Sequence, residues 1–128
     1  MAYSVLVAED EPNIVLSLQF IMKKAGLNVR VAENGAQAVR EIEIEKPDVV
    51  LLDIMLPKQD GFSVCETIKS NAEWADIKVI MLTAKSRDED RQRAMDLGAD
   101  DYITKPFSTR ELVDRVLELV NEDRIADA

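Results

Sequence analysis

The sequence predicts an α/β fold in which a parallel β-sheet carries helices on both of its faces. Strand-like and helix-like patterns alternate about five times along the 128 residues, which is typical of a chain built from β-α units. The segment from Asp48 to Asp53 is almost wholly apolar between its two acidic ends, as expected for a central strand buried on both faces. Neither an internal repeat nor a low-complexity segment interrupts the alternation.

Five short apolar runs are the predicted strands. They cover Tyr3–Ala8, Asn28–Val31, Asp48–Asp53, Ile77–Leu82 and Asp101–Thr104.

The first two helices are predicted from apolar residues at helical spacing and from their end signals. The first begins at Pro12, where proline costs no helical hydrogen bond, and ends before Gly26. Asn34 is the predicted N-cap of the second helix, which ends at Lys46-Pro47.

The later helices follow a loop in which Asp60-Gly61 is a turn-prone pair. Phe62 begins the apolar stripe of the third helix. Two Ser-x-x-Glu patterns, starting at Ser86 and Ser108, are interpreted as capping boxes that open the fourth and fifth helices.

Composition excludes several classes of function. The length is that of one domain, and a net charge of −9 disfavours direct binding to nucleic acid or to an anionic membrane. The absence of histidine removes histidine-based catalysis and histidine metal ligands. One cysteine, Cys65, cannot form an internal disulfide, and no apolar run approaches the roughly 20 residues of a membrane span. We therefore expect a soluble cytoplasmic protein.

Reactive side chains follow four of the predicted strands. Glu9 and Asp10, Asp53, Thr83, and Lys105 each stand at or just past a carboxyl end. In an open α/β sheet, ligands bind outside the carboxyl ends of the strands. Three carboxylates, a hydroxyl and an ammonium group at one edge suit a divalent cation and a phosphoryl group.

Each of these residues also has a plainer interpretation. Asp53 can be a turn or N-cap residue, the Glu9-Asp10 pair a solvated acidic turn, and Thr83 a β-branched strand end. Tyr102 can be buried simply as part of an edge strand, and Pro106 leaves the bond before it trans in all but about 5% of cases. The functional interpretation is favoured because Asp10, Asp53 and Lys105 occur together.

Several longer runs resemble the receiver domain of two-component response regulators, from about Tyr3 to Val120. These runs are Val5–Pro12, Leu51–Pro57, Asp60–Phe62, Met81–Ala84 and Gly98–Phe107. The last is most similar to the subgroup with a winged-helix DNA-binding output domain. The resemblance implies a flavodoxin-like, doubly wound (βα)5 fold with strand order 2-1-3-4-5, a receiver domain over residues 1–121 and a polar tail over 122–128.

The resemblance also implies a phosphoacceptor site. Asp53 accepts a phosphoryl group from a histidine of a sensor kinase or phosphotransfer protein, so the domain catalyses only its own phosphoryl transfer and dephosphorylation. Asp10, Asp53 and the carbonyl of Met55 bind Mg²⁺, or Mn²⁺ in its place, and Glu9 acts through water or from behind these ligands.

The remaining implied roles concern the response to phosphorylation. Lys105 pairs with the phosphoryl group, Thr83 turns toward it, and Tyr102 rotates inward. These movements alter a surface on the fourth helix, fifth strand and fifth helix, which contacts a downstream output domain or effector protein.

In the resembling subgroup, this surface forms a dimer through salt bridges. The residues of suitable charge here are Arg91, Asp100, Asp101, Glu111 and Arg115. Asp114 stands where a small apolar residue is usual, and Glu122 where a basic one is common, so a phosphorylation-dependent homodimer stays open.

Two other functions fit the sequence less well. A phosphohydrolase with an aspartyl-phosphate intermediate needs an acid or base near the nucleophile, and Met55, two residues past Asp53, cannot act as one. A flavodoxin-like cofactor binder needs a phosphate-binding loop, but the sequence contains no glycine-rich loop of that kind.

Overall fold

The computed structural model describes residues 3–84 and 87–127, with side chains described through residue 121. In this part of the chain, one sheet of five parallel strands has the order β2-β1-β3-β4-β5. The strands are β1 (Ser4–Ala8), β2 (Asn28–Ala32), β3 (Val49–Asp53), β4 (Lys78–Thr83) and β5 (Asp101–Thr104). The predicted fold class and strand order are confirmed, and no strand end differs from the prediction by more than one residue.

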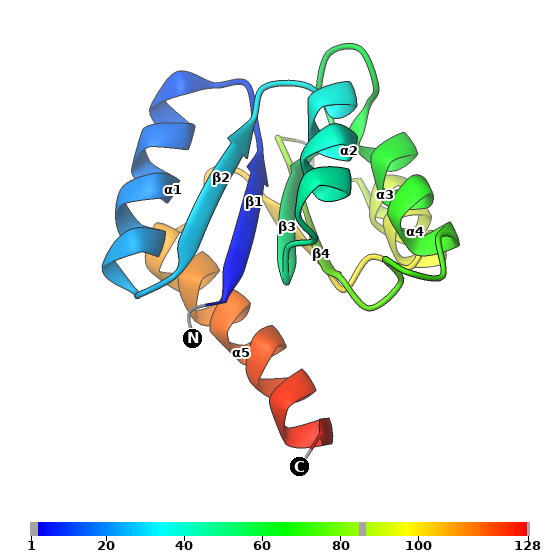
Figure 1. Ribbon diagram of the computed structural model, residues 1–128. Coiled ribbons are helices and arrows are strands. Elements are labelled where there is room, and N and C mark those ends of the chain that lie inside the picture. Colours follow the sequence, from blue (N-terminus) through cyan, green and yellow to red (C-terminus); the bar gives the residue numbers. More distant parts are fainter. Residues whose placement is uncertain (1–2, 85–86, 128) are drawn as a thin grey trace.

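Five helices connect or follow these strands. They are α1 (Pro12–Lys24), α2 (Gly35–Ile44), α3 (Gly61–Ser70), α4 (Asp88–Asp96) and α5 (Thr109–Asp127). Figure 1 shows α1 and α5 on one side of the sheet and α2, α3 and α4 on the other.

Two hydrophobic cores lie on the two faces of the sheet. Leu6 and Ala8 of β1 pack in the core beneath α2, α3 and α4, whereas Val5 and Val7 pack in the core beneath α1 and α5. Alternate residues of a strand point to opposite faces, so one apolar run can serve both cores. All five residues of β3 are buried, as the apolar pattern of this central strand predicts.

Side-chain caps begin three of the helices. The Asn34 side chain accepts a hydrogen bond from the Gln37 N–H at 2.8 Å, and Ser108 Oγ accepts one from the Glu111 N–H at 3.3 Å. Both caps were predicted. Asp60, which the sequence suggests only as part of a turn, is the N-cap of α3.

The predicted ends of α1 are confirmed, whereas α2 ends at Ile44, before the predicted end at Lys46-Pro47. Pro12 occupies the first turn of α1, and Gly26 follows that helix with a φ of 86°. Gly98 follows α4 with a φ of 99°. The left-handed region suits glycine because it has no Cβ. Ser86, of the expected capping box at α4, lies outside the described residues.

The last helix is longer than the sequence suggests. It continues to Asp127, through residues expected to form a polar tail, and its final turns extend past the sheet (Figure 1). Glutamate, arginine and alanine are good helix formers, so this segment can stay helical without an apolar stripe.

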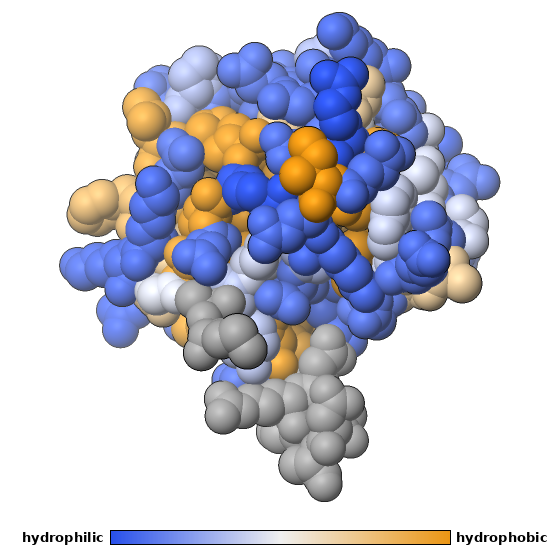
Figure 2. All heavy atoms as spheres, in the orientation of Figure 1, coloured by the Kyte–Doolittle hydropathy of each residue, from blue (hydrophilic) through white to orange (hydrophobic). Residues whose placement is uncertain are grey.

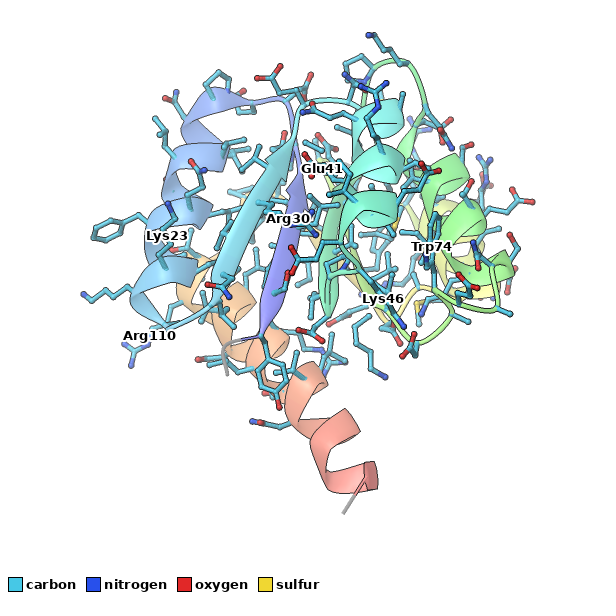
Figure 3. All side chains as sticks on the ribbon, viewed as in Figure 1. Lys23, Arg30, Glu41, Lys46, Trp74 and Arg110 are labelled. Atoms are coloured by element: carbon cyan, nitrogen blue, oxygen red, sulfur yellow. The ribbon has the colours of Figure 1, made fainter. Side chains whose placement is uncertain are left out.

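An arginine side chain ties the edge strand β2 to α2. Arg30 donates to the carbonyl and carboxylate oxygens of Glu41 at 3.0 and 3.1 Å, and also to the carbonyl oxygen of Glu45. Figure 3 shows Arg30 and Glu41 side by side between β2 and α2. Charged side chains on an edge strand discourage pairing with a further strand.

Hydrophilic side chains cover most of the face shown in Figure 2, and the apolar ones form separate patches. Leu16 and Phe20 of α1 are among the exposed apolar residues. No helix in the described ranges combines the length and apolar composition that crossing a bilayer requires.

We expect the Cys65 thiol to be unreactive while the protein is folded. Cys65 has no exposed surface, and burial raises the pKa of its thiol to about 11. Thiolate is the reactive form, so iodoacetamide at pH 8 should leave the folded protein unmodified and alkylate it fully in urea. Intact-mass spectrometry measures both reactions. Equally rapid alkylation with and without urea would contradict the buried placement.

Candidate functional site

Three carboxylates meet at the carboxyl edge of the sheet. Glu9 and Asp10 follow β1, and Asp53 ends β3, the strand paired beside it. One carboxylate oxygen from each residue lies within 4.8 Å of the others. Parallel pairing causes this meeting, because it aligns Ala8 with Leu52 and so ends both strands at one edge. Glu9, Asp10 and Asp53 therefore lie together, as the sequence predicts.

Lys105 reaches the same site from the far side of β4. Its Nζ lies 2.8 Å from Glu9 Oε2 and 3.3 Å from Asp53 Oδ2. Its backbone N–H donates to the Thr83 carbonyl at 2.6 Å, which fixes the chain just beyond β5. The Lys105–Pro106 peptide bond is cis. Lys105 thus pairs with two carboxylates that are remote from it in the sequence.

The site places like charges in buried surroundings. Glu9 is 1% exposed and Asp53 5%, whereas Asp10 is exposed. Burial raises the pKa of Glu9, the Lys105 hydrogen bond opposes this, and the Asp53 charge adds to it. Burial lowers the pKa of Lys105, but Glu9 and Asp53 outweigh burial, so that pKa is raised. The ammonium form is therefore favoured, while the carboxylates remain crowded.

The donor set fits a hard divalent cation. All three side chains offer carboxylate oxygens, which Mg²⁺ prefers, and Mg²⁺ is commonly held by only one or two carboxylates plus phosphate oxygens and water. A cation would relieve the crowding that contributes to the raised pKa of Glu9. The exposed Asp10 leaves one side open to solvent. Glu9, expected to act from behind the ligands, is the carboxylate that Lys105 holds most closely.

Met55 lies beside the acidic cluster through its backbone. Its N–H donates to Asp53 Oδ1 at 3.1 Å, while its side chain is 69% exposed. The bond fixes the start of the loop after β3 against the Asp53 carboxylate. A thioether can neither donate nor accept a proton in catalysis, so this side chain supplies no acid or base.

Thr83 and Tyr102 lie side by side near this edge. Thr83, 3% exposed, ends β4, whose residue Leu82 pairs with Asp53. Tyr102 is 4% exposed, so its ring already faces inward. Burial raises the pKa of Tyr102, and a side-chain hydrogen bond with Thr83 partly offsets this. The guanidinium carbon of Arg91 lies 5.5 Å from the centre of the Tyr102 ring.

Comparison with known proteins identifies the family. The response regulator receiver domain model matches residues 5–117. This chain belongs to the response regulator receiver domains. The family is that of two-component signalling, as the resemblance implied.

Solved receiver domains share the fold across nearly the whole chain. A CheY-like receiver domain protein from Methanospirillum hungatei JF-1 is 27% identical, with a TM-score of 0.92 over 98% of this chain and 99% of that one. A Francisella response regulator receiver domain is 32% identical, with a TM-score of 0.88 over 94% and 98%.

A longer structure also matches. DrrB of Thermotoga maritima, described as an OmpR/PhoB homologue, is 31% identical with a TM-score of 0.86. The match covers 96% of this chain and 54% of DrrB. The assignment of this receiver domain to the subgroup with a winged-helix output domain stays a prediction.

The charged residues expected at a dimer surface are largely engaged within the receiver domain. Arg115 Nε lies 2.7 Å from Asp101 Oδ2, and Asp100 Oδ2 accepts hydrogen bonds from the Val79 N–H and from Lys69. Arg91 packs on Tyr102, as described above. Of the predicted set, the structure pairs only Arg115 with Asp101 directly, and Glu111 is exposed in the first turn of α5.

Two glycines near the site were not recognised from the sequence. A Cβ on Gly61 would lie 2.5 Å from the Asp53 carbonyl oxygen, and one on Gly35 would lie 1.8 Å from that of Gln59. The Asp60-Gly61 pair signalled a turn, and Gly35 followed a recognised N-cap. Neither signal shows which distant backbone approaches.

Removing Lys105 should destabilise the receiver domain. In Lys105→Ala, Glu9 and Asp53 keep buried charge without a cation, and we expect the free energy of unfolding at pH 7 to fall by about 3 kcal/mol. Urea unfolding without divalent cations measures this. Since the pKa of Lys105 is raised above 10.5, its stabilisation persists below that pH and is lost as pH rises through the raised value.

Lys46→Ala is the matched control for this measurement. Lys46 pairs with Asp76 on the surface, where both side chains are substantially exposed. An exposed ion pair contributes less than about 1 kcal/mol, so this variant should unfold nearly as the unmodified protein does. Equal losses in the two variants would show that Lys105 does not balance buried charge.

Proposed function

We propose that this receiver domain is a phosphorylation-dependent signalling switch in which Asp53 is the phosphoacceptor. The observation that carries the proposal is the position of Lys105 Nζ between Glu9 and Asp53, beside a cluster of three carboxylates. An ammonium group and a cation-binding carboxylate set around one buried aspartate are suited to receiving an anionic phosphoryl group.

The proposed phosphoryl donor is a histidine that lies outside these 128 residues, since they contain none. A carboxylate oxygen of Asp53 attacks the phosphorus, a P–O bond forms, and the P–N bond to the donor imidazole breaks. Asp53 Oδ1 accepts the Met55 N–H and Oδ2 faces Lys105, so the carboxylate is held in a defined orientation. The donor is a sensor histidine kinase or a phosphotransfer protein.

Asp10, Asp53 and the Met55 carbonyl are the proposed ligands of Mg²⁺, with Glu9 behind them. When bound, Mg²⁺ supplies positive charge that neutralises the phosphoryl oxygens during transfer. Lys105 orients and balances the same oxygens from the other side. The exposed side chain of Met55 offers no acid or base for an external substrate, so the chemistry is limited to transfer onto Asp53 and its later hydrolysis.

The response passes through Thr83 and Tyr102 to a surface made by α4, β5 and α5. The hydroxyl of Thr83 can bond either to Tyr102 or to a phosphoryl oxygen, which gives it two states. Tyr102 contacts Arg91 of α4, so a change at Thr83 reaches that helix. This surface would bind an output domain or effector protein. The internal Arg115–Asp101 pair argues against a homodimer built from these charges.

Phosphorylation at Asp53 is directly testable. With acetyl phosphate and Mg²⁺, we expect mass spectrometry to show one added phosphoryl group, which is absent in Asp53→Ala. Asp48→Asn is the matched control, because Asp48 precedes the same strand at its opposite end and accepts a hydrogen bond from the Ser4 N–H. Unchanged labelling of Asp53→Ala would falsify the assignment.

The role of Thr83 can be separated from phosphorylation itself. Thr83→Val keeps the shape of the buried side chain and removes its hydroxyl. We expect Asp53 to accept phosphate, while the accompanying NMR shifts of amides in α4, β5 and α5 become at least about twofold smaller. Thr104→Val, at the position paired with Thr83 on β5, is the control. Full-sized shifts in Thr83→Val would show that the hydroxyl does not carry the signal.

A further inference from the structure

The loop after β3, residues 54–60, lies against the first turn of α2. The Gly35 N–H donates to the Pro57 carbonyl at 3.2 Å, and the Gln59 N–H donates to the same oxygen at 2.8 Å. Lys58, which stands between Pro57 and Gln59 in the sequence, has a φ of 69°. These two hydrogen bonds to the Pro57 carbonyl oxygen turn the loop tightly and bring the Gln59 backbone against Gly35.

No side chain fits at position 35 with the loop in this place. A Cβ there would lie 1.8 Å from the carbonyl oxygen of Gln59, whereas real contacts of this kind are essentially never below 3.0 Å. The helix cannot easily retreat, because Ala38 and Ile42 hold α2 in the hydrophobic core. A methyl group on residue 35 would therefore displace the loop.

The same loop is attached to the phosphoacceptor at its other end. The Met55 N–H donates to Asp53 Oδ1 at 3.1 Å, and the Gly61 N–H donates to the Ile54 carbonyl at 2.9 Å. Gly61 also lies so close to the Asp53 backbone that it leaves no room for a Cβ. The loop is thus confined between two glycines, and movement at Gln59 is passed along a short segment to Met55.

We propose that Gly35 is a positioning residue for the Mg²⁺ and phosphoryl site. Its missing Cβ lets the loop lie where the Met55 backbone both orients the Asp53 carboxylate and presents a carbonyl ligand. The inference rests on the proposed function of Asp53, Asp10 and Met55. By this inference, α2 influences the affinity for Mg²⁺ although it contributes no ligand.

The test compares Gly35→Ala with Gly26→Ala. Gly26 has a φ of 86°, so alanine there is also strained, but no atom lies within 4 Å and the residue precedes β2, at the opposite end of the sheet. Isothermal titration with magnesium chloride should show about tenfold weaker binding for Gly35→Ala, the scale expected when support of a metal ligand is lost, and unchanged binding for Gly26→Ala.

A second readout does not depend on the cation. Hydrogen exchange of the Met55 amide, followed by NMR without Mg²⁺, should be faster in Gly35→Ala because its bond to Asp53 is disturbed. Exchange in Gly26→Ala, corrected for its global stability, should match the unmodified protein. If Gly35 served only to stabilise the fold, exchange of the Met55 amide, corrected for global stability, would be the same in both variants.

The outcomes distinguish the two proposals. If the unmodified protein does not bind Mg²⁺, both the proposed function and this inference fail. If it binds Mg²⁺ and Gly35→Ala binds within twofold of it with unchanged Met55 exchange, only the role of Gly35 is overturned. Should Gly35→Ala not fold, Gly35→Ala/Gln59→Gly lets the loop move away from the new methyl group, and the same two measurements decide.

Discussion

Crowding of buried carboxylates at one sheet edge is the constraint on which the rest of this structure depends. Parallel pairing of β1 and β3 ends both strands together, and so it brings Glu9 and Asp53 into buried surroundings. Carboxylates placed in this way disfavour each other's ionised form unless positive charge balances them. The ammonium group of Lys105 does so from a position 96 residues from Glu9 and 52 from Asp53. The whole sheet must therefore form before the charges are balanced.

The helix nearest the proposed signalling route is weakly attached to the domain. Ala94 is the one buried residue of α4, whose remaining contacts include two arginine–aromatic pairs. Arg91 lies over Tyr102 of β5, and Arg93 lies 4.2 Å from the centre of the Phe62 ring of α3. A helix with few buried apolar contacts is free to shift at low cost. In the proposed switch, Arg91 and Arg93 hold α4 from two sides, and only Arg91 contacts the tyrosine that responds to Thr83.

The sequence predicts the scaffold and most of the site, because both follow from local patterns. Apolar runs identify the strands, and the carboxyl-end rule for parallel sheets brings Asp53 and Lys105 together. What depends on the approach of distant backbone is not predicted. Nothing near Gly35 in the sequence shows that Gln59 lies against it. The pairing of Arg115 with Asp101 likewise joins α5 to β5, two elements whose approach the local sequence does not show.

In the proposed switch, the balance of charge at the site would link cation binding to phosphorylation. Lys105 already pairs with Glu9 and Asp53, and a phosphoryl group on Asp53 would raise the negative charge there from one to nearly two. Its oxygens compete with Glu9 for Lys105, yet Glu9 is too buried for water to replace that partner fully. A divalent cation restores the balance without moving Glu9. On this argument, Mg²⁺ would both assist the transfer to Asp53 and make the charge of the phosphorylated state tolerable.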